Sequence, residues 1–208
     1  VTYMDKVVGK ITDALKKNNL DKNTILIFLG DNGTDAKVVT SNNGKEIKGS
    51  KGGTIKYASN VPMILNWNNN IKDPRTSDVL IDFTDFYATF EDILNIENPD
   101  SYGKSLLPLI LNDGYKERDI LITYYNPMWG TRALERGVYA QNKTYKLYKS
   151  GKFFKYSEDL YEETPILLSK LSEKENEIDN SLKKSLDSVP NLPKENHNGW
   201  KERGKQVN

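Results

Sequence analysis

Two short polar stretches of the sequence carry residue types that could do chemistry. Asp31 and Asn32 follow an apolar run at 25–29 after a single glycine, and Lys51 lies beside the glycines of a later polar segment. A carboxylate and an amide both offer oxygen, the ligand atom that suits Ca²⁺ or Mg²⁺ and suits soft metals poorly. A lysine adds a compact cation, and neighbouring glycines let the backbone approach an anion closely. A divalent cation and a lysine that face one oxyanion would form a site for phosphoryl or sulfuryl chemistry.

Each stretch also has a simpler interpretation. Asp31, Asn32 and Gly33 are strong turn formers, so they could do no more than reverse the chain. A lysine among glycines is often a solvated surface turn, and this is the simpler interpretation of Lys51. The elements around the two stretches therefore have to decide between a turn and a site.

The first half of the chain shows an α/β pattern. Its periodicity predicts, in order, a helix over 3–15 that ends at Asn18-Asn19, a buried strand over 25–29, a long polar loop over 34–60, a buried strand over 61–67 that begins near Pro62, and an amphipathic helix over 80–96. A helix that leads into a parallel-type strand is typical of α/β folds. Ligands of open α/β sheets bind beyond the carboxyl ends of strands, which is where Asp31 and Asn32 stand.

The pattern changes after Pro108. Alternating residues predict short, half-exposed antiparallel strands over 120–125, 137–148 and 152–156, and a polar helix is predicted over 167–189. We expect an α/β sheet domain over 1–112, a small antiparallel-sheet α+β subdomain over 113–190, and a tail over 191–208.

Composition excludes several classes of function. The 208 residues are 37% apolar and 28% charged, with a net charge of +1, so the sequence lacks the basic stripe of a nucleic-acid-binding protein. No run approaches the roughly 18 apolar residues of a membrane span, and the first residues lack the pattern of a secretory signal. The chain has no cysteine, which rules out thiol catalysis and thiolate metal sites within it. Because it opens on Val1 in the middle of a helical pattern, we expect a piece of a longer protein.

Five segments of the sequence occur in a characteristic order. They are the helix and strand that end in Gly30-Asp31-Asn32-Gly33, the segment KGGTIKYASNVPMI that starts at Lys51, and the later segments DVLIDFTDFYATFEDILNI, YGKSLLPLI and TYKLYKSGKFFKYSEDLYEETPI. In this order they resemble blocks of the sulfatase family, specifically the carboxyl-terminal half of this alkaline-phosphatase-like fold. The resemblance covers most of the chain up to about residue 190 and favours a site over a simple turn at Asp31-Asn32.

The resemblance implies hydrolysis of a sulfate ester of a small molecule or carbohydrate. Asp31 and Asn32 match late ligands of the family's Ca²⁺, and Lys51 matches the lysine that binds a sulfate oxygen. The family's nucleophile is a formylglycine made from Cys or Ser in a motif that continues through Pro to Arg; Ser188-Val189-Pro190 lacks that Arg. We therefore expect the nucleophile in an upstream part of the same protein, and a periplasmic or secreted location.

Departures from the family pattern fall in segments that face the substrate. Asn60 stands where relatives have His or Arg, and Gly30 replaces a Ser. Trp129 and Arg132 could contact a sugar or a second anionic group, or could simply pack at a hairpin tip. Two rivals remain: a phosphohydrolase of the same superfamily, which would usually show Asp-His-Gly in place of Asp31-Asn32-Gly33, and a noncatalytic carbohydrate-binding or interaction module.

Overall fold

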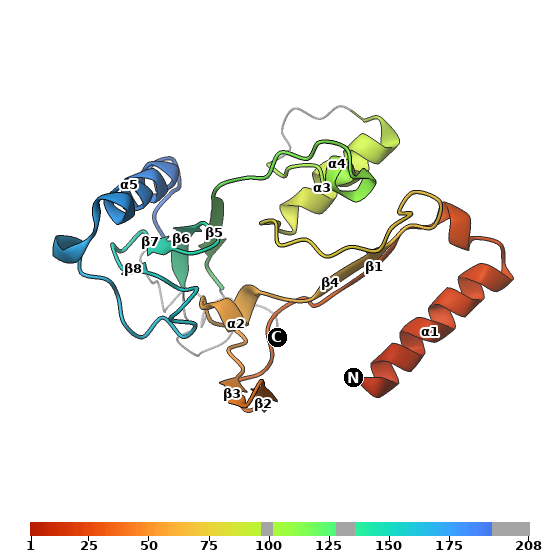
Figure 1. Ribbon diagram of the computed structural model, residues 1–208, viewed down its shortest axis with the longest axis horizontal. Helices are drawn as coiled ribbons and strands as arrows, with labels where there is room; N and C mark the ends of the chain where they lie inside the picture. Colours follow the sequence, from red (N-terminus) through yellow and green to blue (C-terminus); the bar gives the residue numbers. More distant parts are fainter. Residues whose placement is uncertain (97–101, 128–135, 193–208) are drawn as a thin grey trace, which may run out of the picture. The chain divides into compact units, whose positions relative to one another are not determined.

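The computed structural model describes residues 1–96, 102–127 and 136–192. Figure 1 shows the elements in chain order along its colour bar. They are α1 (Thr2–Lys17), η1 (Asp21–Asn23), β1 (Leu26–Leu29), β2 (Val39–Asn42), β3 (Lys45–Lys48), α2 (Lys56–Ser59), β4 (Met63–Asn66), α3 (Thr84–Leu94), α4 (Leu107–Leu111), β5 (Leu121–Tyr125), β6 (Gly137–Gln141), β7 (Lys146–Tyr148), β8 (Phe153–Phe154), η2 (Leu168–Lys170) and α5 (Glu173–Leu186). None of the helices described is long and apolar enough to cross a membrane.

The chain forms two compact units that interleave in sequence. The first unit combines Val1–Gly30 with Pro62–Glu117, and the second combines Asp31–Val61 with the chain from Arg118 onward. The segment 31–61 is thus an excursion, and a hydrogen bond from the Gly30 amide to the Pro62 carbonyl (3.1 Å) closes its base. The predicted boundary near residue 112 stays a prediction.

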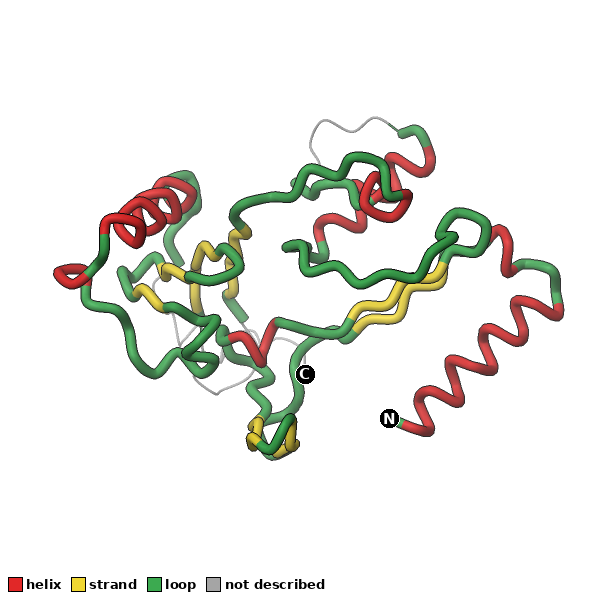
Figure 2. The backbone as a smooth tube through the Cα atoms, in the orientation of Figure 1, coloured by secondary structure: helices red, strands yellow, loops and turns green. Residues whose placement is uncertain are grey.

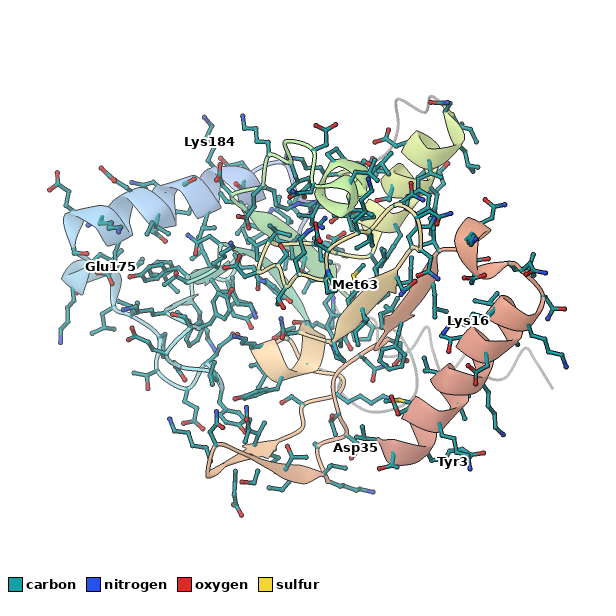
Figure 3. All side chains as sticks on the ribbon, turned by 45° about the vertical axis from the view of Figure 1, so that its right-hand side comes forward. Tyr3, Lys16, Asp35, Met63, Glu175 and Lys184 are labelled. Atoms are coloured by element: carbon teal, nitrogen blue, oxygen red, sulfur yellow. The ribbon has the colours of Figure 1, made fainter. Side chains whose placement is uncertain are left out.

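In the first unit, α1 keeps its apolar side chains accessible. The helix ends as expected, with Asn18 as its C-cap and Asn19 in a left-handed conformation (φ 57°). Its sequence is amphipathic, yet no residue of α1 is buried, and Tyr3 and Ile11 are 80% and 47% exposed. Figure 3 labels Tyr3 and Lys16 on this helix. The apolar pattern therefore forms the predicted helix without burying any of its residues in the described chain.

The strands β1 and β4 pair with each other and correct one expectation. They run antiparallel, with Leu26 opposite Asn66 and Leu29 opposite Met63, whereas a parallel, buried arrangement was expected. The chain reverses direction in the intervening excursion, so its two flanking strands meet in opposite senses. Within the described residues no further strand joins this sheet, and Ile64 remains 64% exposed. Pro62 stands just before β4, as predicted.

The helix α3 begins with a buried carboxylate. Asp85 is fully buried and accepts hydrogen bonds from the amides of Asp82 (2.9 Å) and Lys104 (2.8 Å). Thr89, one turn later, accepts a hydrogen bond from the Leu106 amide (2.8 Å). These polar contacts attach the segment that leads into α4 to α3, because each satisfies a backbone donor that would otherwise be buried without a partner.

In the second unit, the segment expected as a long loop contains a hairpin. β2 and β3 pair antiparallel, with Val39 opposite Lys48, and Figure 2 shows this hairpin as yellow strands within the green trace. Asn43 and Gly44 form its turn with φ of 51° and 76°. Two consecutive residues of positive φ are the requirement of the tight turn that Asn-Gly favours. The loop prediction was wrong here because the sequence indicates only the turn residues and shows no apolar alternation in the strands.

The remainder of the second unit is a four-stranded antiparallel sheet in the order β5-β6-β7-β8, with α5 against β6 and β7. The core between sheet and helix is formed by Val138, Ala140, Leu147, Phe153, Leu182 and Leu186. A capping box between Ser172 and Glu175 starts α5 at Glu173, later than predicted. β5 is half-exposed, as expected, with Ile122 and Tyr124 40% and 43% exposed. The strands β6 to β8 are more buried than expected: on β6, Val138 and Ala140 pack toward α5, and Tyr139 on the opposite face lies beneath the Lys146 ammonium.

Candidate functional site

Three backbone segments of the second unit meet around the residues predicted to act. The Gly33 amide donates to the Ala58 carbonyl (2.8 Å), and the Lys51 amide donates to the Thr34 carbonyl (2.9 Å). A Cβ on Gly33 would lie 1.9 Å from the Tyr57 carbonyl oxygen, and one on Gly49 would lie 2.3 Å from the Thr34 carbonyl oxygen. Both glycines are therefore required by close backbone approach. The contacts hold the stretch that follows Asp31-Asn32 between α2 on one side and the Lys51 turn on the other.

Lys51 stands in a tight turn. The Gly53 amide donates to the Ser50 carbonyl (2.9 Å), and Gly52 adopts a φ of 88° that an L side chain rarely tolerates. The Lys51 side chain is exposed. The glycines therefore shape a turn that presents the lysine with its backbone amide already bonded to Thr34.

The other predicted site residues have different surroundings. Asp31 is exposed and Asn32 is half-buried, and neither side chain has a hydrogen bond or ion pair with another described residue. Asn60 is the exposed C-cap residue of α2, and its amide donates to the Lys56 carbonyl (2.8 Å). Trp129 and Arg132 lie outside the described residues. The predicted roles of all these residues stay predictions.

Asp31 and Asn32 fit a hard cation in chemistry but not in number. They offer a carboxylate and an amide oxygen with no competing partner among the described residues. Ca²⁺ takes roughly six to eight oxygen ligands, so two side chains fill only part of its coordination shell. In the described part of the chain no three His, Cys, Asp or Glu residues are grouped to hold a metal. A Ca²⁺ ion at Asp31 and Asn32 would thus need further ligands beyond those described here.

A buried ring of four interactions lies directly downstream of Lys51. The Lys146 ammonium donates to the Thr54 backbone carbonyl and to the Glu162 carboxylate (2.8 Å). The Tyr148 hydroxyl donates to the other Glu162 oxygen (2.5 Å), and the Thr54 and Tyr148 hydroxyls are 2.9 Å apart. Thr54 therefore takes part in the ring through two groups, its backbone carbonyl and its side-chain hydroxyl.

The ring is buried and its charges are paired. The Lys146 and Glu162 side chains are 2% and 3% exposed, and the ammonium lies 3.8 Å from the centre of the Tyr139 ring. Burial, with the hydrogen bond to Glu162, raises the pKa of Tyr148, so its hydroxyl remains a donor. Glu162 adopts a left-handed φ of 56°, at a typical cost of about 1–2 kcal/mol. Removing one partner of such a buried pair leaves an uncompensated charge and typically costs about 3–5 kcal/mol.

A second group of contacts also joins the segment 31–61 to the C-terminal part of the second unit. Tyr161 stacks at a tilt on Tyr57 (5.1 Å between ring centres), and its hydroxyl accepts from the Lys48 amide (2.8 Å). Sequence reasoning singled out neither Tyr161 nor the buried ring. A lysine in an alternating strand normally indicates a solvated face, and its partner Glu162 is distant enough in sequence that no local spacing indicates the pair.

Comparisons with known proteins identify the family. Residues 1–96 match the model described as Sulfatase, and residues 55–191 match the model described as N-sulphoglucosamine sulphohydrolase, C-terminal. The second match alone covers more than half of the chain. The chain therefore belongs to the sulfatase family and corresponds to its C-terminal portion.

Curated relatives and solved structures agree with this assignment. The uncharacterised sulfatase YdeN of Escherichia coli is 36% identical over 111 residues, which are 52% of this chain and 20% of that protein. An endo-4-O-sulfatase of Bacteroides thetaiotaomicron is 26% identical over 175 residues, 72% of this chain and 33% of that protein. This chain thus spans a third or less of their length. A putative sulfatase structure from the same Bacteroides species has a TM-score of 0.66 at 20% identity, over 88% of this chain and 39% of that one.

Another solved sulfatase, described as a complex with its substrate D-glucosamine-2-N,6-O-disulfate, has a TM-score of 0.69 at 21% identity. The match covers 89% of this chain and 39% of the solved chain. At 20% and 21% sequence identity, these two structures support the fold alone. The predicted fold class is confirmed: part of an alkaline-phosphatase-like α/β domain, followed by a small antiparallel-sheet α+β subdomain.

Proposed function

We propose that this chain contributes Asp31, Asn32 and Lys51 to the active site of a sulfatase that hydrolyses sulfate esters of carbohydrates. The observation that supports the proposal is the backbone hydrogen bond between the Lys51 amide and the Thr34 carbonyl, which holds the turn that carries Lys51 against the segment that follows Asp31 and Asn32. The family assignment supports the reaction class. The relatives described as acting on an amino-sugar disulfate and as an endo-4-O-sulfatase support a sulfated carbohydrate as the substrate class.

Each residue has a distinct role in the proposed site. Asp31 and Asn32 would hold Ca²⁺ through oxygen, and that ion, when bound, supplies positive charge against the sulfuryl oxygens. Lys51 would bind a sulfate oxygen in the ground state and would strengthen that contact as charge moves to the leaving oxygen. Asn60, Trp129 and Arg132 are proposed to contact the rest of the substrate.

The attacking group is proposed to come from outside these 208 residues, because they contain no cysteine and no complete Ser-x-Pro motif followed by Arg. Electrostatic stabilisation without a nucleophile does not start the reaction. The 208-residue chain alone should therefore show no turnover of an aryl sulfate, and turnover by this pure chain would contradict the proposal.

The metal role can be tested with matched aspartates in the full-length protein. Asp31→Ala should weaken Ca²⁺ binding, measured by calorimetry, by roughly a hundredfold and lower turnover of a sulfated saccharide in parallel. Asp35→Ala is the control: Asp35 lies just downstream (Figure 3) and its carboxylate accepts from the Lys37 amide (2.9 Å). Equal Ca²⁺ affinity in the two variants would remove Asp31 from the metal site.

Preference of the full-length protein for the matching phosphate ester would favour a phosphohydrolase, and binding of the saccharide without turnover would favour a noncatalytic module.

A further inference from the structure

We propose that the buried ring of Thr54, Lys146, Glu162 and Tyr148 positions Lys51, so that the C-terminal sheet sets the geometry of the proposed sulfate site. This inference rests on the proposed function for its catalytic consequence, but its structural content can be tested without activity. Lys146, Glu162 and Tyr148 act here as positioning residues, because they reach the site only through Thr54.

The direction of the hydrogen bonds identifies Thr54 as the residue that the ring fixes. Tyr148 donates its proton to Glu162, so the Thr54 hydroxyl is the donor in its contact with Tyr148. The Thr54 carbonyl accepts from the Lys146 ammonium. With its carbonyl and its hydroxyl both engaged, and only 1% of the residue exposed, Thr54 is held at two points.

Thr54 is separated from Lys51 only by Gly52 and Gly53. Glycines are the most flexible residues of a chain, so they would not by themselves keep a lysine in place. The turn is held upstream by the Lys51 amide on Thr34 and downstream by the ring on Thr54. An exposed ammonium on a turn that is anchored at both ends loses less entropy when it binds an anion than one on a free loop.

The atoms packed around Thr54, Tyr148 and Glu162 leave these residues of the ring little room to move. A Cβ on Gly137 would lie 3.1 Å from the Thr54 methyl group and 3.2 Å from the Tyr148 ring. The left-handed backbone of Glu162 is held by its own amide on the Asp159 carbonyl (3.0 Å), and the Asp159 carboxylate accepts from the amides of Glu163 and Thr164. The ring is thus supported by the close packing of β6 at Gly137 and by the turn at 159–164 that carries Glu162.

Removal of a single hydroxyl tests this without unpairing the buried charges. In the full-length protein, Tyr148→Phe keeps the Lys146–Glu162 pair and removes the link to the Thr54 side chain. Tyr145→Phe is the matched control, because its hydroxyl donates to Glu175 on α5 (3.2 Å) and not to the ring. We expect the amides of Lys51 and Gly53 to exchange with deuterium roughly tenfold faster in Tyr148→Phe and to be unchanged in Tyr145→Phe. Thr54→Val, which removes the other hydroxyl of the same contact, should reproduce the effect if Tyr148→Phe folds poorly.

Kinetics then separate a positioning role from general loosening. Tyr148→Phe should lower kcat/KM for the sulfate ester roughly tenfold, and this loss should fall below about twofold in a Lys51→Ala background, since the two changes act through one group. Unchanged exchange at 51–53 in both Tyr148→Phe and Thr54→Val would overturn the inference and leave the proposed function standing. Faster exchange in a protein that never hydrolyses sulfate esters would support the positioning and sink the proposed function. A kinetic loss that is equally large without Lys51 would also overturn the inference.

Discussion

Two regions of the molecule differ in what their apolar side chains contact. One is the sheet of β5, β6, β7 and β8 with α5, and the other is the two-stranded sheet of β1 and β4 with α1. In the C-terminal sheet, Phe153 and Leu182 are fully buried, and the helix and the sheet bury each other. In the N-terminal elements an equally regular apolar pattern leaves α1 without one buried residue and Ile64 largely exposed. Periodicity therefore predicts the element in both regions, but a core forms only where a second apolar surface lies within the described chain.

The largest effect expected from this difference is on stability. In the 208-residue chain, Leu182→Ala should lower the free energy of unfolding by about 2–5 kcal/mol, because it removes a fully buried side chain between α5 and the sheet. Ile11→Ala on α1 should change it by less than about 0.5 kcal/mol. Urea denaturation of both variants measures the contrast. Similar losses would show that the face of α1 is covered and that the comparison fails.

A second contrast concerns two glycines. Gly33→Ala should destabilise the second unit by about 1–3 kcal/mol, because the new methyl group would collide with the Tyr57 carbonyl. Gly9→Ala in α1 meets no atom within 4 Å and should stabilise the helix by up to about 1 kcal/mol. Thermal unfolding should therefore shift in opposite directions for the same chemical change. A Gly33→Ala variant with the wild-type melting temperature would mean that α2 does not approach Gly33 closely.

The sequence reveals elements better than it reveals their partners. The helices α1, α3 and α5 and the strands β5 and β8 were predicted because each carries its own periodicity. The stretch 137–148, predicted as one strand, divides into β6 and β7 at a turn in which the Asn142 side-chain oxygen accepts from the Thr144 and Tyr145 amides. The β2–β3 hairpin was missed although Asn43-Gly44 is a strong turn signal, since its strands are mostly polar. The direction of pairing of β1 and β4 depends on how the intervening segment returns, which no local pattern encodes.

The candidate site divides in the same way. Asp31, Asn32 and Lys51 could be selected because their chemistry and order resemble a family. Lys146 and Glu162 could not, because a buried ion pair exists only through tertiary contact, and in sequence each residue resembles a solvated charge. Reasoning from residue types thus finds groups that would touch a substrate more readily than groups that hold them in place.

The central claim is that Lys51 is the ammonium of a sulfatase site, and its most direct test is a pair of lysine variants of the full-length protein. Lys51→Ala should lower kcat/KM for a sulfate ester by roughly a hundredfold, about 2.7 kcal/mol, because it removes one preorganised partner of the developing charge. Lys56→Ala, on α2 in the same segment, should change the rate only slightly. Near-normal turnover in Lys51→Ala together with loss of turnover in Lys56→Ala would contradict the account and move the site to α2.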